Sequence, residues 1–149
     1  MSNRVTVEID IAAPPEKVWE IAMDPDRLGD WVTIHRKVAK ASDRPLRDGS
    51  TVEQTLCLRG INFKVKWEVA EAREPEVAIW EGRGPARSRA HTEYRLSARD
   101  GGTRFEYANE FKPPLGPLGA AASRALVGGT PEREAKASLQ RLKDLVEKG

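Results

Sequence analysis

Few side chains in this sequence combine the types and the spacing that acid–base catalysis requires. His35 directly precedes Arg36, and a histidine can remove a proton alpha to a carbonyl while an arginine stabilises the enolate. Tyr94 is a third candidate, since a tyrosine hydroxyl can donate a proton. The alternative, which we favour, places His35 on the exposed face of an edge strand beside a solvated arginine. The catalytic candidates are therefore His35, Arg36 and Tyr94, and no motif joins them.

Metal and nucleotide sites are not indicated by the sequence. The soft metal ligands are His35, His91 and Cys57, which lie far apart and lack a characteristic spacing. His91 falls among charged residues and is expected on the surface, while Cys57 shares the strand parity of Glu53 and Thr55 and should face outward. No glycine-rich segment follows a strand and opens a helix, as a phosphate-binding loop requires. We therefore expect no metal and no cofactor.

A second group of polar residues occupies the same alternate positions as the apolar residues of the predicted strands. These polar residues are therefore expected on the inward face. A buried polar group costs a few kcal/mol unless it is paired, so these residues either pair with one another or orient the polar end of a ligand. Three tryptophans join them as large apolar groups with a polar tip, and each could fill the core instead. The candidate ligand-binding residues are Trp31, Gln54, Trp67, Trp80, Thr92, Tyr94, Tyr107 and Asn109.

The strands that position these residues are predicted from hydrophobic periodicity. Apolar and polar residues alternate over residues 5–11 and 61–69, which is typical of antiparallel strands with one wet face. Further strands are predicted near 33–41, 51–59, 77–84, 87–96 and 104–111. In the first of these, Ile34 and Val38 should face inward and His35 outward. The strand near 77–84 has ambiguous parity, and Gly82, Gly84 and Pro85 suggest a bulge or bend at its end.

Helices are predicted early in the chain and at its end. Pro14-Pro15 begins a helix that stops at Asp24-Pro25, and a short turn follows over residues 26–30. Residues 115–127 have a weak helical pattern that Gly128-Gly129 interrupts. From Thr130-Pro131-Glu132 onward, Ala135, Leu139, Leu142 and Val146 repeat at helical spacing, with Glu134 among the residues on the wet side. Whether this terminal helix is broken at Gly128–Pro131 stays open.

This order of elements predicts an α+β fold in which the antiparallel sheet wraps around the last helix. A hollow between sheet and helix can bind an apolar ligand. The residues expected to be buried are Val5, Val7, Ile9, Phe63, Val65, Trp67, Leu96, Phe105, Leu139 and Leu142.

Several segments of the chain match a known family. Val5–Ile11 is followed by Ala12-Ala13-Pro14-Pro15-Glu16-Lys17-Val18-Trp19, then by Asp24-Pro25 and Trp31, and the chain closes with Leu139–Glu147. These segments resemble the START-like (SRPBCC) helix-grip superfamily, and most of all its polyketide cyclase/dehydrase and lipid-transport branch. The resemblance implies a seven-stranded curved antiparallel sheet wrapped around a long C-terminal helix, with an elongated cavity. It also implies a hydrophobic small molecule, such as a lipid or a polyketide, as the partner.

Length and composition limit the remaining classes of protein. The 149 residues suit a single domain over residues 1–149. Charged residues make up 32% of the chain but the net charge is only +2, which argues against a nucleic-acid binder. The single cysteine fits a reducing cytoplasm. No apolar stretch approaches the length of a membrane span, and no signal peptide is visible.

Three functions compete on this basis. The first is a carrier or sensor that binds an apolar, ring-containing small molecule without catalysis. The second is a cyclase/dehydrase-type enzyme that uses acid–base residues of the cavity and no metal. The third is an interaction module whose cavity is filled by side chains. In each case we expect a monomer or weak homodimer, since no heptad seam is present.

Overall fold

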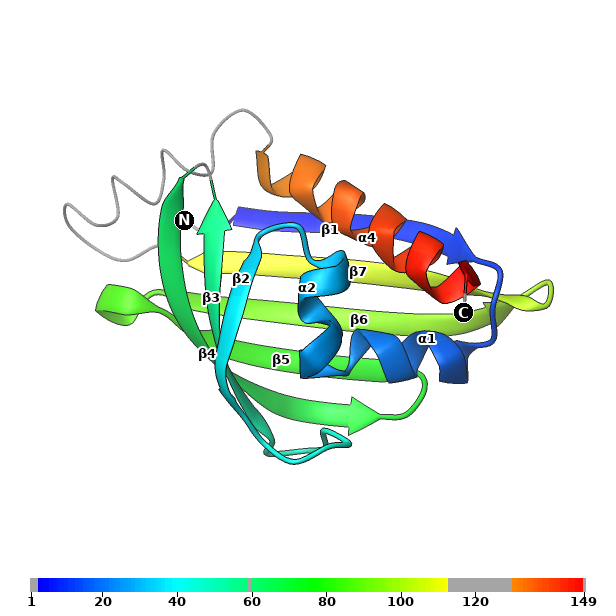
Figure 1. Cartoon of the computed structure of the whole chain (residues 1–149), viewed down its shortest axis with the longest axis horizontal. Helices are drawn as coiled ribbons and strands as arrows, with labels where there is room; N and C mark the ends of the chain where they lie inside the picture. The colour runs from blue at the N-terminus through cyan, green and yellow to red at the C-terminus, as the bar shows by residue number, and fades with distance from the viewer. Residues whose placement is uncertain (1–2, 59, 113–129, 149) are drawn as a thin grey trace.

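The computed structural model describes residues 3–58, 60–112 and 130–148, and in them one sheet dominates. Its strands are β1 (Asn3–Ile11), β2 (His35–Ala41), β3 (Thr51–Leu58), β4 (Ile61–Arg73), β5 (Val77–Arg83), β6 (Arg89–Arg99) and β7 (Gly102–Lys112). They form a seven-stranded antiparallel sheet in the order β1-β7-β6-β5-β4-β3-β2, so β1 and β2 are its edges. The predicted α+β, helix-grip arrangement is confirmed, because the curved sheet carries a long C-terminal helix on one face (Figure 1).

In the described part of the chain, the α-helices lie on the same face of the sheet (Figure 1). They are α1 (Pro15–Ala22), α2 (Leu28–Trp31) and α4 (Thr130–Lys148), with short 3-10 turns η1 (Pro25–Arg27) and η2 (Pro85–Arg87). Helix α4 packs against β1, α1 and α2. The start of α1 follows Pro14 as predicted, and Asp24 Oδ1 accepts a 2.9 Å hydrogen bond from the Asp26 backbone N–H where η1 begins. The helix predicted over 115–127 and its interruption at Gly128-Gly129 lie outside the described residues.

The core is packed more tightly at one end of α4 than at the other. Leu142 and Val146 in the second half of the helix are fully buried, together with Val18 and Phe105. Six of the ten residues expected in the core are buried: Val7, Val65, Leu96, Phe105, Leu139 and Leu142. The expectation was wrong for Val5, Ile9, Phe63 and Trp67, which are only half-buried. Three of these four, Val5, Phe63 and Trp67, line a hollow, so part of each side chain stays exposed.

Strand β2 departs from the predicted alternation. Its pairing with β3 shifts register between His35 and Lys37 and again between Val38 and Lys40. At each shift β2 has one residue more than β3, and this extra residue turns the side chains after it to the other face. Partial burial therefore recurs every third residue, at His35, Val38 and Ala41. The prediction that His35 faces outward was therefore wrong.

Gly82 on β5 makes room for a large side chain on the next strand. It pairs with Trp67 on β4, and a Cβ atom at this position would lie 2.8 Å from the Trp67 ring and 2.8 Å from Val65 Cγ1. The predicted bend near Gly84 is confirmed as the turn η2, whereas the register shift in this region lies on β4, between Val69 and Glu71. The absence of a side chain at Gly82 thus lets the Trp67 indole lie against the sheet.

Gly82→Ala should lower the free energy of unfolding by about 1–3 kcal/mol, because overpacking forces the Trp67 ring and the Val65 side chain to move. Urea denaturation would measure the loss. Ser97→Ala, an exposed change on β6, is the control and should stay within about 0.5 kcal/mol of the wild-type protein. A Gly82→Ala variant as stable as the control would contradict this account of Trp67 packing.

Candidate ligand-binding cavity

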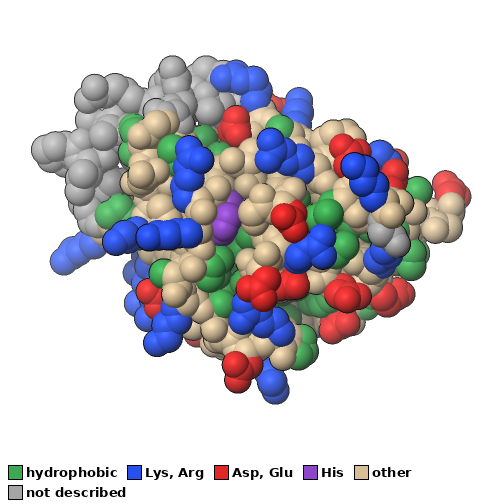
Figure 2. All heavy atoms as spheres, viewed as in Figure 1, with side chains coloured by type: hydrophobic (Ala, Val, Ile, Leu, Met, Phe, Trp, Pro, Cys, Tyr) green, Lys and Arg blue, Asp and Glu red, His purple; other side chains and the backbone are tan. Residues whose placement is uncertain are grey.

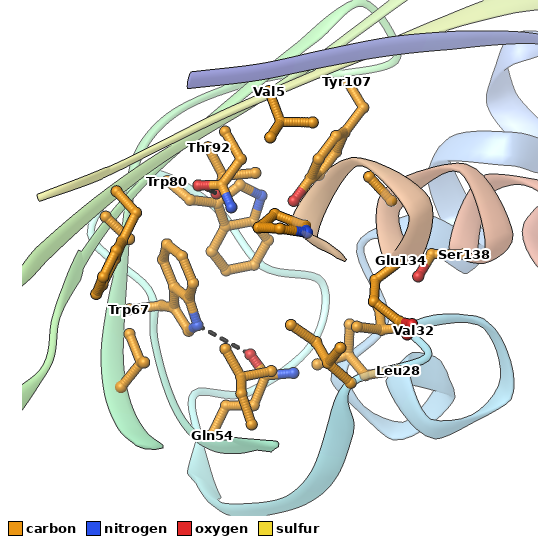
Figure 3. A pocket seen from close by; sticks show the side chains of 18 of the residues that line it. Val5, Leu28, Val32, Gln54, Trp67, Trp80, Thr92, Tyr107, Glu134 and Ser138 are labelled. Atoms are coloured by element: carbon orange, nitrogen blue, oxygen red, sulfur yellow. Dashed lines mark hydrogen bonds between the residues drawn. The ribbon is translucent and has the colours of Figure 1, made fainter. Parts of the chain in front are cut away.

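A cavity of about 190 Å³ lies between the concave face of the sheet and the first half of α4 (Figure 3). For comparison, an engineered apolar cavity of about 150 Å³ holds one benzene molecule. Its walls are mainly apolar: Leu56 and Phe63 come from the far strands, Leu28 from α2, and Ala135 and Leu139 from α4. The hollow is therefore large enough for a small ring compound and presents hydrocarbon to it on most sides.

All eight residues that the sequence suggested for ligand binding line this cavity: Trp31, Gln54, Trp67, Trp80, Thr92, Tyr94, Tyr107 and Asn109. Trp31 comes from α2, and the other seven come from strands β3 to β7, which the antiparallel register brings side by side. Tyr94 is also a catalytic candidate, and it is the member of that trio that reaches the cavity. Arg36 is exposed, and neither it nor His35 is among the described lining residues.

A polar patch crosses β6 and β7. Thr92 lies opposite Asn109 and Tyr94 lies opposite Tyr107 in the strand register. The Thr92 hydroxyl donates to Asn109 Oδ1 at 3.2 Å, and the two tyrosine rings lie 6.1 Å apart between centroids. Figure 3 shows Thr92 and Tyr107 on the same wall of the pocket. The four side chains thus form one group on the concave face.

Both tyrosines of this patch keep their protons at neutral pH. Burial, with a smaller effect of Tyr107, raises the pKa of Tyr94 far above its usual range. Burial also raises the pKa of Tyr107 to about 12, although the neighbouring Asn109 and Thr92 side chains oppose the shift. A neutral phenol is a hydrogen-bond donor and acceptor but a poor base. The patch can therefore orient a bound group by hydrogen bonds, whereas the raised pKa values make both tyrosines weaker proton donors than an ordinary tyrosine.

Gln54 connects the cavity wall to the edge strand. Trp67 Nε1 donates to Gln54 Oε1 at 2.9 Å, a bond visible in Figure 3, and Gln54 Nε2 lies 2.8 Å from His35 Nδ1. An indole can only donate, so the amide oxygen must face Trp67 and the amide nitrogen must donate to His35. His35 Nδ1 is then an acceptor, and the ring is neutral with its proton on Nε2. Burial also lowers the pKa of His35, in agreement with this tautomer.

Two polar cavity residues on α4 were missed from the sequence. Thr33 Oγ1 donates to Glu134 Oε1 at 2.6 Å, and the Thr33 backbone N–H donates to Ser138 Oγ at 3.0 Å. Both Glu134 and Ser138 line the cavity, whereas Glu134 was predicted on the wet side of the helix, which was wrong. Ser138 lies three residues after Ala135 and four before Leu142, so helical spacing could have placed it on the buried face. These bonds fasten the first turns of α4 to the segment before β2.

Other kinds of site find no support in the part of the chain that the structure describes. No group of three or more His, Cys, Asp or Glu side chains in these residues could hold a metal ion. No helix in them is long and apolar enough to cross a membrane. Cys57 is partly buried and is absent from the described cavity lining, whereas Leu56 and Leu58 on either side of it belong to that lining.

Comparisons with known proteins find a matching family model, a sequence relative and solved structures of the same fold. A family model described as "Polyketide cyclase / dehydrase and lipid transport" matches residues 2–147. The protein named "Toxin Rv0910" of Mycobacterium tuberculosis (strain H37Rv) is 26% identical over 125 residues, which is 83% of this chain and 87% of the relative.

Two solved structures show the same fold at low sequence identity. TTHA0849 from Thermus thermophilus has a TM-score of 0.80 and 18% identity, with 98% of both chains covered. The Zhui aromatase/cyclase from Streptomyces sp. R1128 has a TM-score of 0.77 and 18% identity, with 99% of this chain and 95% of the other covered. At this identity the likeness establishes the fold alone.

The second histidine lies on the opposite, convex face of the sheet. His91 Nε2 lies 2.7 Å from Glu93 Oε2, and His91 Nδ1 contacts Glu81 Oε1. Burial alone would lower the pKa of His91, but the hydrogen bonds of Glu93 and Glu81 outweigh burial and raise it above 6.5. On the other side of the molecule, the helix-bearing face that Figure 2 shows, acidic and basic side chains also stand close together. The two histidines thus occupy opposite environments, one that favours the neutral ring and one that favours the cation.

An NMR titration should therefore separate the two imidazole signals, with the His35 midpoint below 6.5 and the His91 midpoint above it. By linkage, the stability that neutral His35 contributes is present above pH 6.5 and is lost as the pH falls through its folded pKa. The His91 contribution is present below pH 6.5 and is lost as the pH rises through its folded pKa. A His91→Gln variant assigns the signals, and two midpoints at the ordinary value would contradict both environments.

Proposed function

The chain belongs to the polyketide cyclase/dehydrase and lipid-transport family, and from this premise we propose that it binds an apolar, ring-containing small molecule in its cavity, as a carrier or sensor. The observation that carries the proposal is the cavity itself, about 190 Å³ of space with a mainly apolar wall. Apolar surface removed from water on binding contributes about 25 cal/mol per Å². A ring compound of this size therefore has a favourable place to bind.

Aromatic side chains favour a ring over a flexible chain as the ligand. Trp67 and Trp80 meet edge to face with centroids 6.4 Å apart, and Trp80 and Tyr94 lie 6.2 Å apart. Aromatic pairs prefer such edge-to-face and tilted geometry, which a bound ring can extend. The patch of Thr92, Tyr94, Tyr107 and Asn109 then fixes the orientation of the ligand by hydrogen bonds.

A cyclase- or dehydrase-type reaction is the alternative. Glu134 supports it, because a carboxylate on the cavity wall can act as a general base opposite the protonated tyrosines. His35 and Arg36 contribute less to this alternative than the sequence suggested, since neither is among the described lining residues. The carrier or sensor role is preferred because one carboxylate oxygen of Glu134 is already bonded to Thr33. Incubation of the protein with a bound polyketide-like ketone, followed by mass spectrometry, distinguishes binding from turnover.

The setting of this function is inferred from the sequence. We propose that the protein acts in the cytoplasm as a monomer or weak homodimer, without a metal, a cofactor or nucleic acid as partner. The single cysteine fits a reducing compartment, and the near balance of charge offers little attraction to nucleic acid.

Ala135→Leu should block binding, because the larger side chain occupies the cavity from α4. We expect affinity for small uncharged ring compounds to fall about tenfold or more, measured by tryptophan fluorescence titration. Stability should be kept, since the new methyl groups fill a hollow instead of a packed core. Ala137→Leu is the matched control, two residues along the same helix and exposed. Equal affinity of both variants for the same compounds would place the binding elsewhere and overturn the proposal.

Tyr107→Phe should weaken binding of a ligand with a polar end by about 0.5–1.5 kcal/mol, the usual contribution of one hydrogen bond. Asn109→Leu on the same strand should act in the same direction. Isothermal titration calorimetry with a ligand found in the screen measures both. If both variants bind as the wild type does, the patch is structural only. If binding persists but conversion of the ligand stops, the enzyme alternative gains over the carrier.

A further inference from the structure

A chain of two hydrogen bonds leads from the edge strand β2 to the cavity wall. Gln54 Nε2 donates to His35 Nδ1 at 2.8 Å, and Gln54 Oε1 accepts from Trp67 Nε1 at 2.9 Å. Gln54 and Trp67 line the cavity, and Figure 3 shows the bond between them on its wall. His35 is not among the described lining residues. The two bonds therefore connect a side chain behind the wall to the surface that a ligand would touch.

The His35 ring is held between its neighbouring strand and α2. Leu56 on β3 lies opposite His35 in the strand register. On the other side, a Cβ atom at Gly29 of α2 would lie 3.4 Å from His35 Cδ2, so the ring lies close to the helix backbone there. The side chain is half-buried. The ring thus has a fixed place in the structure and still exchanges protons with solvent.

The chain of hydrogen bonds requires His35 to be neutral. A neutral imidazole can accept at Nδ1, whereas an imidazolium donates from both nitrogens and would set a second donor against Gln54 Nε2. If the Gln54 amide turned over, its oxygen would accept from His35, but its nitrogen would then face the Trp67 N–H, which can only donate. Protonation of His35 therefore breaks one of the two hydrogen bonds in either case.

No fixed ion pair holds a proton on His35 in the described part of the chain. The charged or titratable residues on the elements around the ring are Asp26, Arg27, Asp30, Glu53, Cys57 and Glu134. Burial lowers the pKa of His35, and none of these residues contributes to the shift. Arg36 and Lys37, which follow His35 on β2, are exposed. The protonation of the ring is therefore set by the pH and by its burial.

A ligand in the cavity would make the broken bond more costly. In the free protein, water that enters the hollow can pair with the donor that protonation releases. A bound apolar ligand displaces this water and leaves the donor unpaired in an apolar setting. Binding therefore favours the neutral ring. By reciprocity, a bound ligand should also make His35 harder to protonate.

We propose that His35 is a positioning residue for ligand binding: as a neutral acceptor it holds Gln54 and Trp67 in the cavity wall, and its protonation releases them and weakens binding. The inference rests on the proposed binding function and adds control by pH to the same cavity. Because a donor left unpaired is costly, affinity should fall about three- to tenfold when the ring is protonated.

Calorimetric titration with tetralin, a neutral bicyclic hydrocarbon that does not itself titrate, tests the proposal on the wild-type protein. Affinity should be highest at about pH 7.5, where His35 is neutral, and should fall by this factor one pH unit below the His35 midpoint. Saturating tetralin should also move the NMR midpoint of His35 to lower pH. Equal affinity at both pH values, or an unchanged midpoint, overturns the proposal and leaves the proposed binding function intact.

Two substitutions of the same residue separate positioning from packing. His35→Leu removes the acceptor and should bind tetralin about three- to tenfold more weakly than the wild type at about pH 7.5. His35→Asn places an amide oxygen, which accepts but does not titrate, at the position of Nδ1. It should restore most of the affinity that His35→Leu loses, and it should remove the loss at low pH. Equal losses in both variants, or an unchanged loss at low pH in His35→Asn, would contradict the role of the acceptor.

His91→Gln is the control for the other histidine. His91 lies on the convex face with Glu81 and Glu93, away from the cavity, so this variant should keep the wild-type dependence of affinity on pH. A dependence that disappears in His91→Gln would assign the effect to His91 and overturn the proposal.

The indole N–H signal of Trp67 tests the chain of bonds in the wild-type protein without any ligand. The Trp67→Phe spectrum identifies this signal among those of the four tryptophans. It should shift with the same midpoint as the His35 ring, since protonation of His35 disturbs the Gln54 amide that accepts from it. A Trp67 signal that does not follow the His35 titration overturns the proposal. Failure of tetralin to bind at about pH 7.5, with the two titrations still coupled, instead overturns the binding function for ligands of this size.

Discussion

The contact of a single helix with a seven-stranded sheet is the constraint on which the rest of this structure depends. One helix has one apolar stripe, and on α4 that stripe includes Leu139, Leu142 and Val146. These side chains meet β1 and α1 and close the core at the C-terminal half of the helix. At the other half, Pro131 and Ala135 are too small to reach the far strands, so a cavity remains there. The hollow is thus a result of residue size along one helix face.

Polar contacts hold both ends of α4, at the packed half of the helix and at the half that lies over the cavity. At the packed end, the Ala12 backbone N–H donates to Glu147 Oε2 at 2.8 Å and Lys143 Nζ donates to the Asp10 carbonyl at 3.1 Å. At the hollow end, Thr33 bonds both Glu134 and Ser138. The helix therefore has a fixed position over the cavity although few apolar side chains hold it there. Binding energy gained in such a preformed hollow is not spent on moving the helix.

The sequence predicts this fold well wherever the hydrophobic period is regular. Alternation in β1 and β4 predicted the correct inward faces, and in the structure the turn Asp100-Gly101-Gly102 joins β6 to its neighbour β7. The prediction failed where a local irregularity changes the period, as at the register shift between His35 and Lys37, which puts His35 on the same face as Val38. The alternation also could not separate packed from cavity-lining residues, because Val5 and Val7 point to the same face of β1 and only Val5 is among the described lining residues. The hydrogen bonds that join His35 to Trp67 through Gln54 depend on distances that no spacing rule supplies.

The register shifts of β2 also bear on how molecules of this protein meet one another. An edge strand with a straight row of free N–H and C=O groups is a template on which a second chain can add its own strand. In β2 two irregularities interrupt that row, and the exposed side chains along it include the cations Arg36, Lys37 and Lys40. Like charges on two approaching copies repel, and a bulged edge offers no continuous ladder to pair with. The same distortion that turns His35 toward the inner face thus works against edge-to-edge pairing at β2.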